Sequence, residues 1–170
     1  MLEFDYEKYG GWMRGATKED LVALAPRLRK ADRDECIATT GLPPELVVPK
    51  ALAEGHEVYV GGIIESPTPE LVVGFTPITE GAATIWMVSS DVVFDHRLRF
   101  LRVTRDAIEA CHDRYHILTN FIDERNTDHL MWLKWLNFKI IRRVTLGPQN
   151  LPFLEFVSIR EQCAYPSQEP

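Results

Sequence analysis

Apolar residues follow two different periods along the chain, and the changes between them mark its helices and strands. Early in the chain three leucines recur at helical spacing and share one face: Leu21, Leu24 and Leu28. Thr17 precedes them with Asp20 three residues later, an arrangement related to the capping box that favours a helix start. We therefore predict a short strand over 11–15, followed by a helical region that begins after Thr17 and ends at Gly41. A second helical segment is predicted to open at Pro43 and Pro44, to be split at Pro49 and to close at Gly55.

The middle of the chain has the composition of β-strands. β-Branched and aromatic residues dominate three segments, which cover 57–64, 71–76 and 83–88. The turns between these segments are short, so we predict that the three strands pair as an antiparallel meander.

A helical period returns after the third of these strands. Asp95 is the predicted N-cap, and apolar residues follow it at helical spacing: Leu98, Leu101, Ile108, Cys111 and Tyr115. The same patterns predict one more helix, over 126–136, and three more strands, over 117–122, 138–145 and 153–159. Asn137 follows the last helix, where the chain needs a left-handed residue that asparagine can supply.

The predicted elements follow one another in the order strand, two helices, three strands, helix, strand, helix, two strands. The chain has 170 residues and no internal repeat or linker, so we predict one α/β domain over 1–160. We expect a mixed, mostly antiparallel central sheet flanked by helices. The polar, proline-containing segment 161–170 is predicted to be a disordered tail.

Charge and composition argue against several classes of partner. The formal net charge is −6, and no basic stripe is present, which argues against nucleic acid because phosphate contacts need clustered Lys and Arg. No apolar segment approaches the roughly 20 residues that cross a bilayer, and residues 1–10 lack the pattern of a secretory signal. We therefore expect a cytoplasmic protein that binds neither nucleic acid nor a membrane.

The positions of cysteine and histidine argue against a metal centre. The three cysteines include no C-x-x-C pair, so neither a disulfide framework nor a structural zinc site is expected. His112 and His116 lie four residues apart on a predicted helix, which is a metal-ligand spacing, but no third ligand of matching character accompanies them. We predict no bound metal.

Two segments resemble the GNAT superfamily of N-acetyltransferases. Residues 13–21 are similar to the first strand of that family as it turns into the first helix. Residues 126–138 are similar to a late family motif, in which an asparagine begins a helix that ends in leucine, glycine and phenylalanine. Here the corresponding end is Leu136, Asn137 and Phe138. The resemblance implies a GNAT fold, acetyl-CoA as the cofactor and an amine as the acceptor.

A narrower resemblance covers residues 86–135. This segment is similar to a GNAT-like family encoded by tailed phages. Members of that family combine a strand ending in Trp-Met-Val with an Arg- and Leu-rich helix and the pattern Asn-x-x-His-x-x-Trp-Leu-x-Trp-Leu. The resemblance implies a phage origin, with a role in virion assembly or in altering a host protein.

The resemblance to GNAT enzymes also implies a cofactor site. Acetyl-CoA would bind where a strand ends and the next helix begins, with Asn126 as a further ligand. The positions that correspond to this site are Val88, Ser89, Ser90 and Arg97. The loop 89–95 departs from the family because it has no glycine and carries Asp91 and Asp95, whose charges would repel a pyrophosphate.

No general acid of the family type is present. The tyrosine that protonates the leaving thiolate in many family members corresponds to Leu133, which cannot donate a proton. Tyr115, His129 and a water molecule are alternative acids, although His129 is also explained as a hydrogen-bonded core histidine. Glu65, near the end of a predicted strand, is a candidate base for an amine, and it is also explained as an exposed carboxylate.

Three functions are compatible with these observations. The first is a phage-encoded GNAT-like protein with a degenerate acetyl-CoA site, which acts in virion assembly or as a protein-interaction factor. The second is an active acetyl-CoA-dependent N-acetyltransferase that acts on a protein or a small amine. The third is an inhibitor that binds a host protein through an acidic surface. In each case we expect the protein in the host cytoplasm, and in the first also in the virion.

Overall fold

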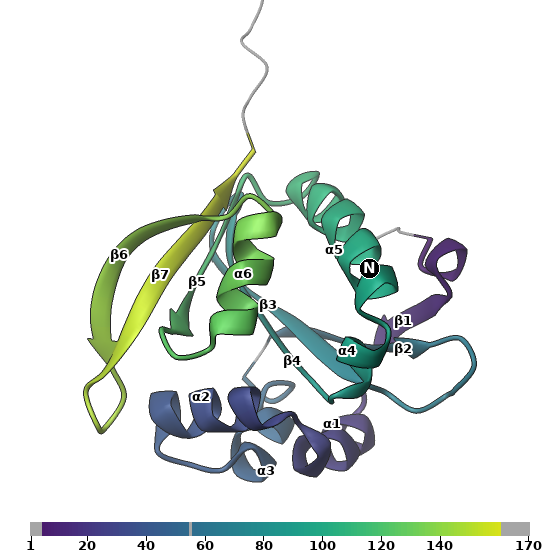
Figure 1. The fold of residues 1–170 in the computed structure, drawn as a ribbon, viewed down its shortest axis with the longest axis horizontal. Coiled ribbons are helices and arrows are strands. Elements are labelled where there is room, and N and C mark those ends of the chain that lie inside the picture. Colours follow the sequence, from purple (N-terminus) through teal and green to yellow (C-terminus); the bar gives the residue numbers. More distant parts are fainter. Residues whose placement is uncertain (1–4, 55, 161–170) are drawn as a thin grey trace, which may run out of the picture.

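The computed structural model describes residues 5–54 and 56–160 of the chain. Within these ranges seven strands form one sheet in the order β1-β2-β3-β4-β5-β7-β6 (Figure 1). Their bounds are β1 (Gly11–Gly15), β2 (Glu57–Ile63), β3 (Leu71–Thr79), β4 (Ala82–Ser89), β5 (Ile117–Asp123), β6 (Lys139–Leu146) and β7 (Leu151–Ile159). Neighbouring strands pair antiparallel except β4 and β5, so the predicted mostly antiparallel sheet, with its meander of β2, β3 and β4, is confirmed.

Helices cover both faces of the sheet, as expected for an α/β protein. Their bounds are α1 (Lys18–Leu24), α2 (Lys30–Thr40), α3 (Pro44–Val47), α4 (Val92–Asp95), α5 (Arg97–His112) and α6 (Thr127–Trp135). Figure 1 places α1, α2 and α3 on one side of the sheet and α5 and α6 on the other. Each side has its own hydrophobic core: Leu21 and Leu24 of α1 pack on Val60 and Val72 beneath the first group, while Leu133 of α6 belongs to the core beneath the second.

β4 and β5 lie side by side over only part of their length. The register of this parallel pair covers Ala82–Thr84 against Ile117–Thr119, and the strands then diverge (Figure 1). Beyond the paired part, the Asn120 side-chain amide still donates to the carbonyl of Ile85 at 2.9 Å. Because the backbone ladder stops there, a gap opens in the middle of the sheet, and side chains rather than main-chain hydrogen bonds must line it.

The predicted start of the helical region after Thr17 and its end at Gly41 are confirmed, but the region is not one continuous helix. Thr17 and Asp20 form a complete capping box, in which the side chain of each accepts from the backbone N–H of the other. The helical region is interrupted at Leu28 and Arg29, whose backbones are extended. The interruption has a tertiary cause, because Arg29 N–H donates to the carbonyl of Ser89 at the end of β4 at 2.9 Å.

The helix after β4 begins later than predicted. Asp95 is the last residue of the short helix α4, and His96 occupies the N-cap of α5 without a side-chain capping bond. The short helix α4 comes between β4 and α5, and at its start the Ser90 hydroxyl accepts from the backbone N–H of Val92 at 3.3 Å. At the other end of the domain the local signals hold: the Asn126 side chain caps α6, and Asn137 has a left-handed φ of 66°.

Several further expectations concern the ends and thiols of the chain. The predicted disordered tail, 161–170, lies outside the described residues, and so does Cys163. Cys36 and Cys111 are free thiols, and burial raises the pKa of Cys111 to about 12. Among the described helices, none combines the length and the apolar character that a bilayer crossing would need.

Candidate active site

A cavity of about 520 Å³ passes through the gap between β4 and β5. Consecutive residues of β4 line it from Ile85 to Val88, and their side chains alternate between the two faces of the sheet. Ile85 packs on the α5 and α6 side, while Trp86 and Val88 pack on the α1 to α3 side. The cavity therefore reaches both faces of the sheet, which lets two molecules approach each other from opposite sides.

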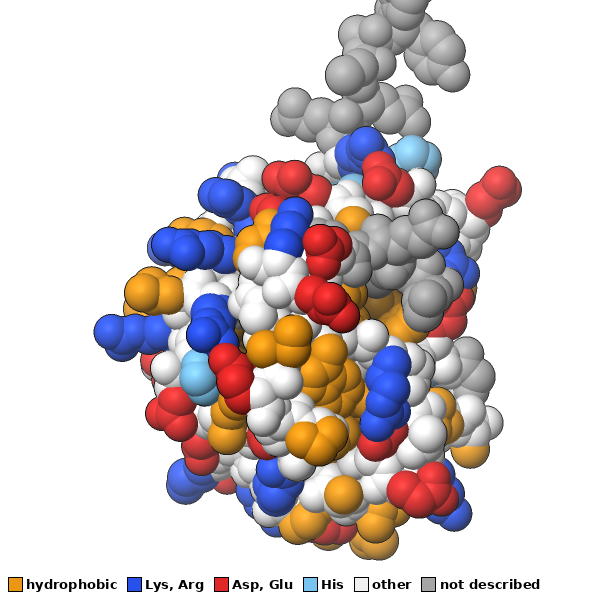
Figure 2. All heavy atoms as spheres, turned by 90° about the vertical axis from the view of Figure 1, so that its right-hand side faces the viewer, with side chains coloured by type: hydrophobic (Ala, Val, Ile, Leu, Met, Phe, Trp, Pro, Cys, Tyr) orange, Lys and Arg blue, Asp and Glu red, His pale blue; other side chains and the backbone are white. Residues whose placement is uncertain are grey.

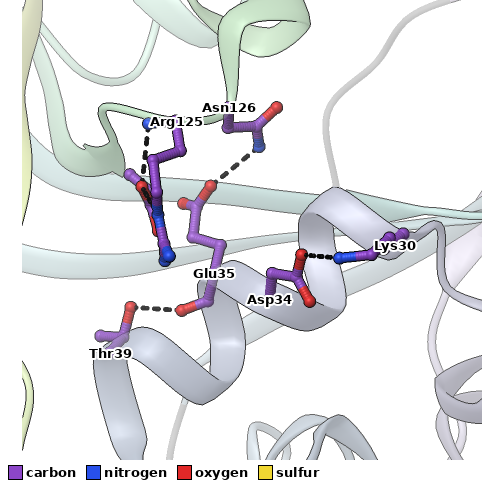
Figure 3. A network of polar contacts seen from close by, with 7 residues as sticks. Lys30, Asp34, Glu35, Thr39, Arg125 and Asn126 are labelled. Atoms are coloured by element: carbon purple, nitrogen blue, oxygen red, sulfur yellow. Dashed lines mark hydrogen bonds and ion pairs between the residues drawn. The ribbon is translucent and has the colours of Figure 1, made fainter. Parts of the chain in front are cut away.

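Helix α2 spans the open end of the gap and is bonded to both of its sides. The Asp32 carboxylate accepts from the backbone N–H of Ser89, at the end of β4, at 2.8 Å. One turn later, the Glu35 carboxylate accepts from the side-chain amide of Asn126, beside β5, at 2.9 Å (Figure 3). Residues three apart share a helix face, so a single face of α2 carries both contacts. Both carboxylates line the cavity.

The two carboxylates have different electrostatic partners. Asp32 forms a buried ion pair with Arg29, whose two nitrogens lie 2.8 and 2.7 Å from its oxygens. Burial raises the pKa of Asp32 and the Arg29 contact opposes that rise. Burial also raises the pKa of Glu35, to about 7; the Asn126 amide opposes this rise, and the charges of Asp32 and Asp123 reinforce it. Glu35 is therefore placed to accept and release a proton near neutral pH.

Figure 3 shows how the side chain of Glu35 lies. It extends away from the axis of α2 toward Asn126, at the turn between β5 and α6. Arg125, in the same turn, is held by Asp123 through bonds of 2.9 and 3.1 Å from Nε. Its guanidinium is therefore occupied by another carboxylate, which leaves an uncharged amide as the hydrogen-bond partner of Glu35.

His129 is a second titratable side chain in the cavity wall. Burial, helped by the charge of Arg29, lowers the pKa of its imidazole to about 3, so the ring is neutral across the physiological range. The ring lies 4.8 Å from that of Trp132. Its Nδ1 is buried and has no hydrogen-bond partner among the described residues. A neutral imidazole with a free polar atom can bind a ligand, and it is a poor proton donor at neutral pH.

The structure separates the other two catalytic candidates from the cavity. Tyr115 lies in the core beneath α5, stacked on Phe75 with 6.0 Å between ring centroids, and it is not among the residues that line the cavity. Glu65 is exposed and accepts from Arg99 at 3.0 Å. Leu133, at the position of the family's tyrosine, lines the cavity and is 3% exposed. Of the three candidates, the structure brings only His129 into the described cavity.

The predicted cofactor residues fall into different environments. Val88 lines the cavity. Ser89 and Ser90 are buried, and their backbone N–H groups donate to Asp32 and to the carbonyl of Glu70. Arg97 is exposed in the first turn of α5, and Asn126 is buried and holds Glu35. The residues that line the cavity at this end are Val92, Val93, His96 and Arg99.

The acidic residues of the loop do not face the cavity. Asp91 and Asp95 are exposed and are absent from the described lining, whereas His96 and Arg99 belong to it. The turn of α4 directs Val92 and Val93 inward, so any repulsion of a phosphate by the two carboxylates would act at the mouth of the cavity and stays a prediction. Apolar walls beside the first turn of α5 fit a long, thin acyl-CoA arm with its phosphates at the mouth.

The histidine spacing on α5 has a structural explanation. His112 Nδ1–H donates to the carbonyl of Tyr115, and Nε2 accepts from the Ser158 hydroxyl, each at 2.8 Å. The ring therefore fastens the end of α5 to β7. Nowhere in 5–54 or 56–160 do three or more His, Cys, Asp or Glu side chains gather in a way that could hold a metal ion.

Glu35 was not predicted from the sequence. The available signal was weak: Asp32, Glu35 and Ala38 recur every three residues on one face of a helix, and Asp32 and Ala38 are buried. A run of acidic residues usually marks a solvated face. The partner of Glu35, Asn126, is 91 positions away in the chain, so the residues near Glu35 do not predict the contact.

No protein-family model matches the chain, and no curated protein matches its sequence. Solved structures match its fold. A GCN5-related N-acetyltransferase from Kribbella flavida superposes with a TM-score of 0.64 at 17% identity, covering 90% of this chain and 99% of the other. Ribosomal-protein-S5-alanine acetyltransferase from Vibrio fischeri superposes with a TM-score of 0.61 at 13% identity, covering 92% of this chain and 94% of the other. A Salmonella typhimurium protein assigned as an acetyltransferase was solved with its cofactor acetyl-CoA. It superposes with a TM-score of 0.56 at 12% identity, covering 94% of this chain and 99% of the other. The chain therefore has the fold of the GNAT N-acetyltransferases.

Proposed function

We propose that this protein transfers an acetyl group from acetyl-CoA to a primary amine, with Glu35 as the general base. The observation that carries the proposal is the position of Glu35, whose carboxylate lies in the wall of the cavity between β4 and β5 with its pKa raised to about 7. The GNAT fold supports it, because its solved relatives include acetyltransferases and one structure with acetyl-CoA. Fold alone does not establish an activity, so the site must carry the argument.

The chemistry requires a proton acceptor at the amine. Acetyl-CoA, when bound, supplies a thioester carbonyl to the gap, and Val92, Val93, His96 and Arg99 would hold it. An ammonium ion has no free electron pair, so Glu35 takes one proton from it and Asn126 keeps the carboxylate in place. The nitrogen–carbon bond forms, the carbon–sulfur bond breaks, and coenzyme A leaves as a thiolate. The nitrogen then loses its second proton, and because Leu133 donates none, water relays this proton to the thiolate, so we expect slow turnover.

A second candidate is a phage-encoded GNAT-like scaffold with weak or lost catalysis, which acts in virion assembly or as an interaction factor in the host cytoplasm. Two observations favour it. The Ser89 N–H is taken by Asp32, so it is not free for a cofactor. Apolar side chains also gather on one face of the molecule among charged groups of both signs (Figure 2). Among the described residues, large apolar side chains such as Leu98 and Ile64 are 66% and 54% exposed, and exposed apolar patches are typical of protein–protein contacts.

Acetyl-CoA binding separates the two candidates. Under the enzyme proposal, acetyl-CoA at a hundred times its dissociation constant stabilises the fold by about 2.7 kcal/mol in a thermal or chemical unfolding experiment. Release of free thiol in the presence of primary amines then measures transfer. Binding without transfer favours the scaffold, and no stabilisation at millimolar acetyl-CoA refutes the enzyme.

The role of Glu35 has its own test. Glu35→Gln keeps an acceptor for the Asn126 amide but cannot take a proton, so we expect kcat to fall about 100-fold or more with little change in acetyl-CoA affinity. Glu45→Gln is the matched control, because Glu45 is exposed and pairs with Arg33 at 2.8 Å. Equal activity of the two variants would remove Glu35 from the mechanism.

A further inference from the structure

The arm of the cavity on the α1 to α3 side combines apolar walls with acidic groups. Val47, Val48 and Ala51 line it together with Trp86, and Glu35 of α2 also belongs to the lining, where it contacts Asn126 at the start of α6. This arm lies on the opposite face of the sheet from the α5 wall, where the acyl-CoA arm fits. A second reactant bound in this arm would therefore reach the gap from the side opposite the acyl-CoA arm.

The charges of this arm favour a cation. Asp32, Glu35 and Glu54 line the cavity on this side. Among the described lining residues the only Lys or Arg is Arg99, which lies on α5 against Gly10. Asp32 is already neutralised by Arg29, which leaves Glu35 with an uncharged partner. A cleft of one sign attracts a ligand of the other, so a positively charged group is favoured beside Glu35.

Trp86 provides an aromatic surface in the same arm. Its indole lies over Gly74 of the neighbouring strand, because a Cβ at Gly74 would stand only 2.2 Å from the ring. Its Nε1–H donates to His56 Nδ1 at 3.3 Å, which fixes the direction of the ring. A glycine that admits a large ring across a strand pair is a specific arrangement, and the indole gives the apolar body of a ligand a large aromatic surface to pack against.

His129 adds an observation that points to a ligand independently of the charges. Its Nδ1 is buried in the wall of the cavity with no partner among the described residues, and buried polar atoms in folded proteins are nearly always hydrogen-bonded. Because Asn126 accepts from the backbone N–H of His129 and donates to Glu35, it holds both residues at the same end of α6. An N–H group of a bound ligand would satisfy the orphaned nitrogen.

We infer that the acceptor is a primary monoamine with an apolar, aromatic or aliphatic body, bound with its ammonium group at Glu35 and His129 and its body along Trp86. This inference rests on the proposed acetyl transfer and names the substrate class of that site. A polyamine or a lysine-rich peptide would place further charges against Val47, Val48 and Ala51. This is costly, because the carboxylate of Asp32 is already paired with Arg29 and that of Glu54 is 60% exposed to solvent. The volume of about 520 Å³ suits a small ligand together with the end of the acyl-CoA arm.

Binding of defined amines tests the inference without requiring transfer. In isothermal titration calorimetry we expect 2-phenylethylamine and n-hexylamine to bind at least about tenfold more tightly than spermidine, ethanolamine or the uncharged 2-phenylethanol. Trp86→Phe should keep most of this affinity, while Trp86→Leu should lose about tenfold. Gly74→Ala, which displaces the indole, should behave like Trp86→Leu.

The outcomes separate this inference from the proposed function. Stabilisation by acetyl-CoA, measured on every variant, reports both the fold and the cofactor site independently of the amine. If acetyl-CoA binds but spermidine binds and is acetylated in preference to 2-phenylethylamine, the substrate class is wrong and the enzyme proposal stands. If the apolar amines bind and acetyl-CoA does not, the amine site stands and the transfer proposal fails. Equal amine affinity of wild type and Trp86→Leu, with both proteins folded, refutes the role of Trp86.

Discussion

Replacing Glu35 should change how the stability of the protein depends on pH. The folded state holds the pKa of Glu35 near 7, against 4.5 for the usual glutamate, mainly because the carboxylate is buried. Between these values the folded protein keeps a proton that the unfolded chain has released. Stability from the protonated carboxyl is therefore fully present below pH 4.5 and is lost as the pH rises through 7.

The size of the effect follows from the same shift. At about 1.36 kcal/mol per pKa unit, the charged carboxylate costs the folded state roughly 3 kcal/mol above pH 7. This is an upper limit, because the side chain keeps some contact with solvent, which screens its charge. A glutamine side chain at this position has no charge to bury and can still accept from Asn126. Relative to wild type, Glu35→Gln should therefore gain up to about 3 kcal/mol between pH 4.5 and 8, or roughly 6–12 °C in Tm.

Urea unfolding followed by tryptophan fluorescence at several pH values measures this difference directly. Glu45→Gln is the control. The contact with Arg33 lowers the pKa of Glu45, so its contribution to stability is lost only as the pH falls below 4.5. Between pH 5 and 8 the Glu45→Gln curve should run parallel to wild type. A Glu35→Gln curve that also runs parallel would mean that Glu35 is an ordinary solvated acid, and the argument for it as a base would fail.

Three other substitutions test separate parts of the structure. Asn126→Asp keeps the helix cap but sets a second carboxylate against Glu35, so the midpoint of kcat/KM against pH should move about one unit more alkaline; an acid shift or none would contradict the contact. Gly147→Ala should cost about 2–4 kcal/mol in urea unfolding, because φ is 70° and the new Cβ would lie 1.8 Å from a carbonyl oxygen of α2, while Gly15→Ala, with open space around its Cβ, is the control. Leu133→Tyr places a phenol in the cavity, and we expect kcat to rise about tenfold at a stability cost of about 1–3 kcal/mol; a kcat no higher than wild type would show that thiolate protonation is not limiting.

Local signals in the sequence determined most of the secondary structure. The capping box of Thr17 and Asp20 and the left-handed Asn137 involve residues within a few positions of one another, so the chain order itself brings the partners together. The β-branched and aromatic composition likewise placed the ends of β2, β3 and β4 within one residue, except that β3 runs three residues further than predicted. The GNAT fold could be inferred from this order of elements together with the segment that ends in Phe138.

Tertiary structure decided the site, because its contacts join residues that are distant in the chain. The helix predicted through Leu28 and Arg29 is broken there by hydrogen bonds to the end of β4, which no local propensity encodes. The sequence places Asp91 in the loop after β4, but only the fold shows that its side chain is exposed and lies outside the cavity lining. The pKa of Glu35 depends on burial and on Asn126, 91 positions away. Hydrophobic periodicity and helix caps depend on residues that are close in sequence. The burial and charge environment of Glu35 arises only when α2 packs across the gap between β4 and β5.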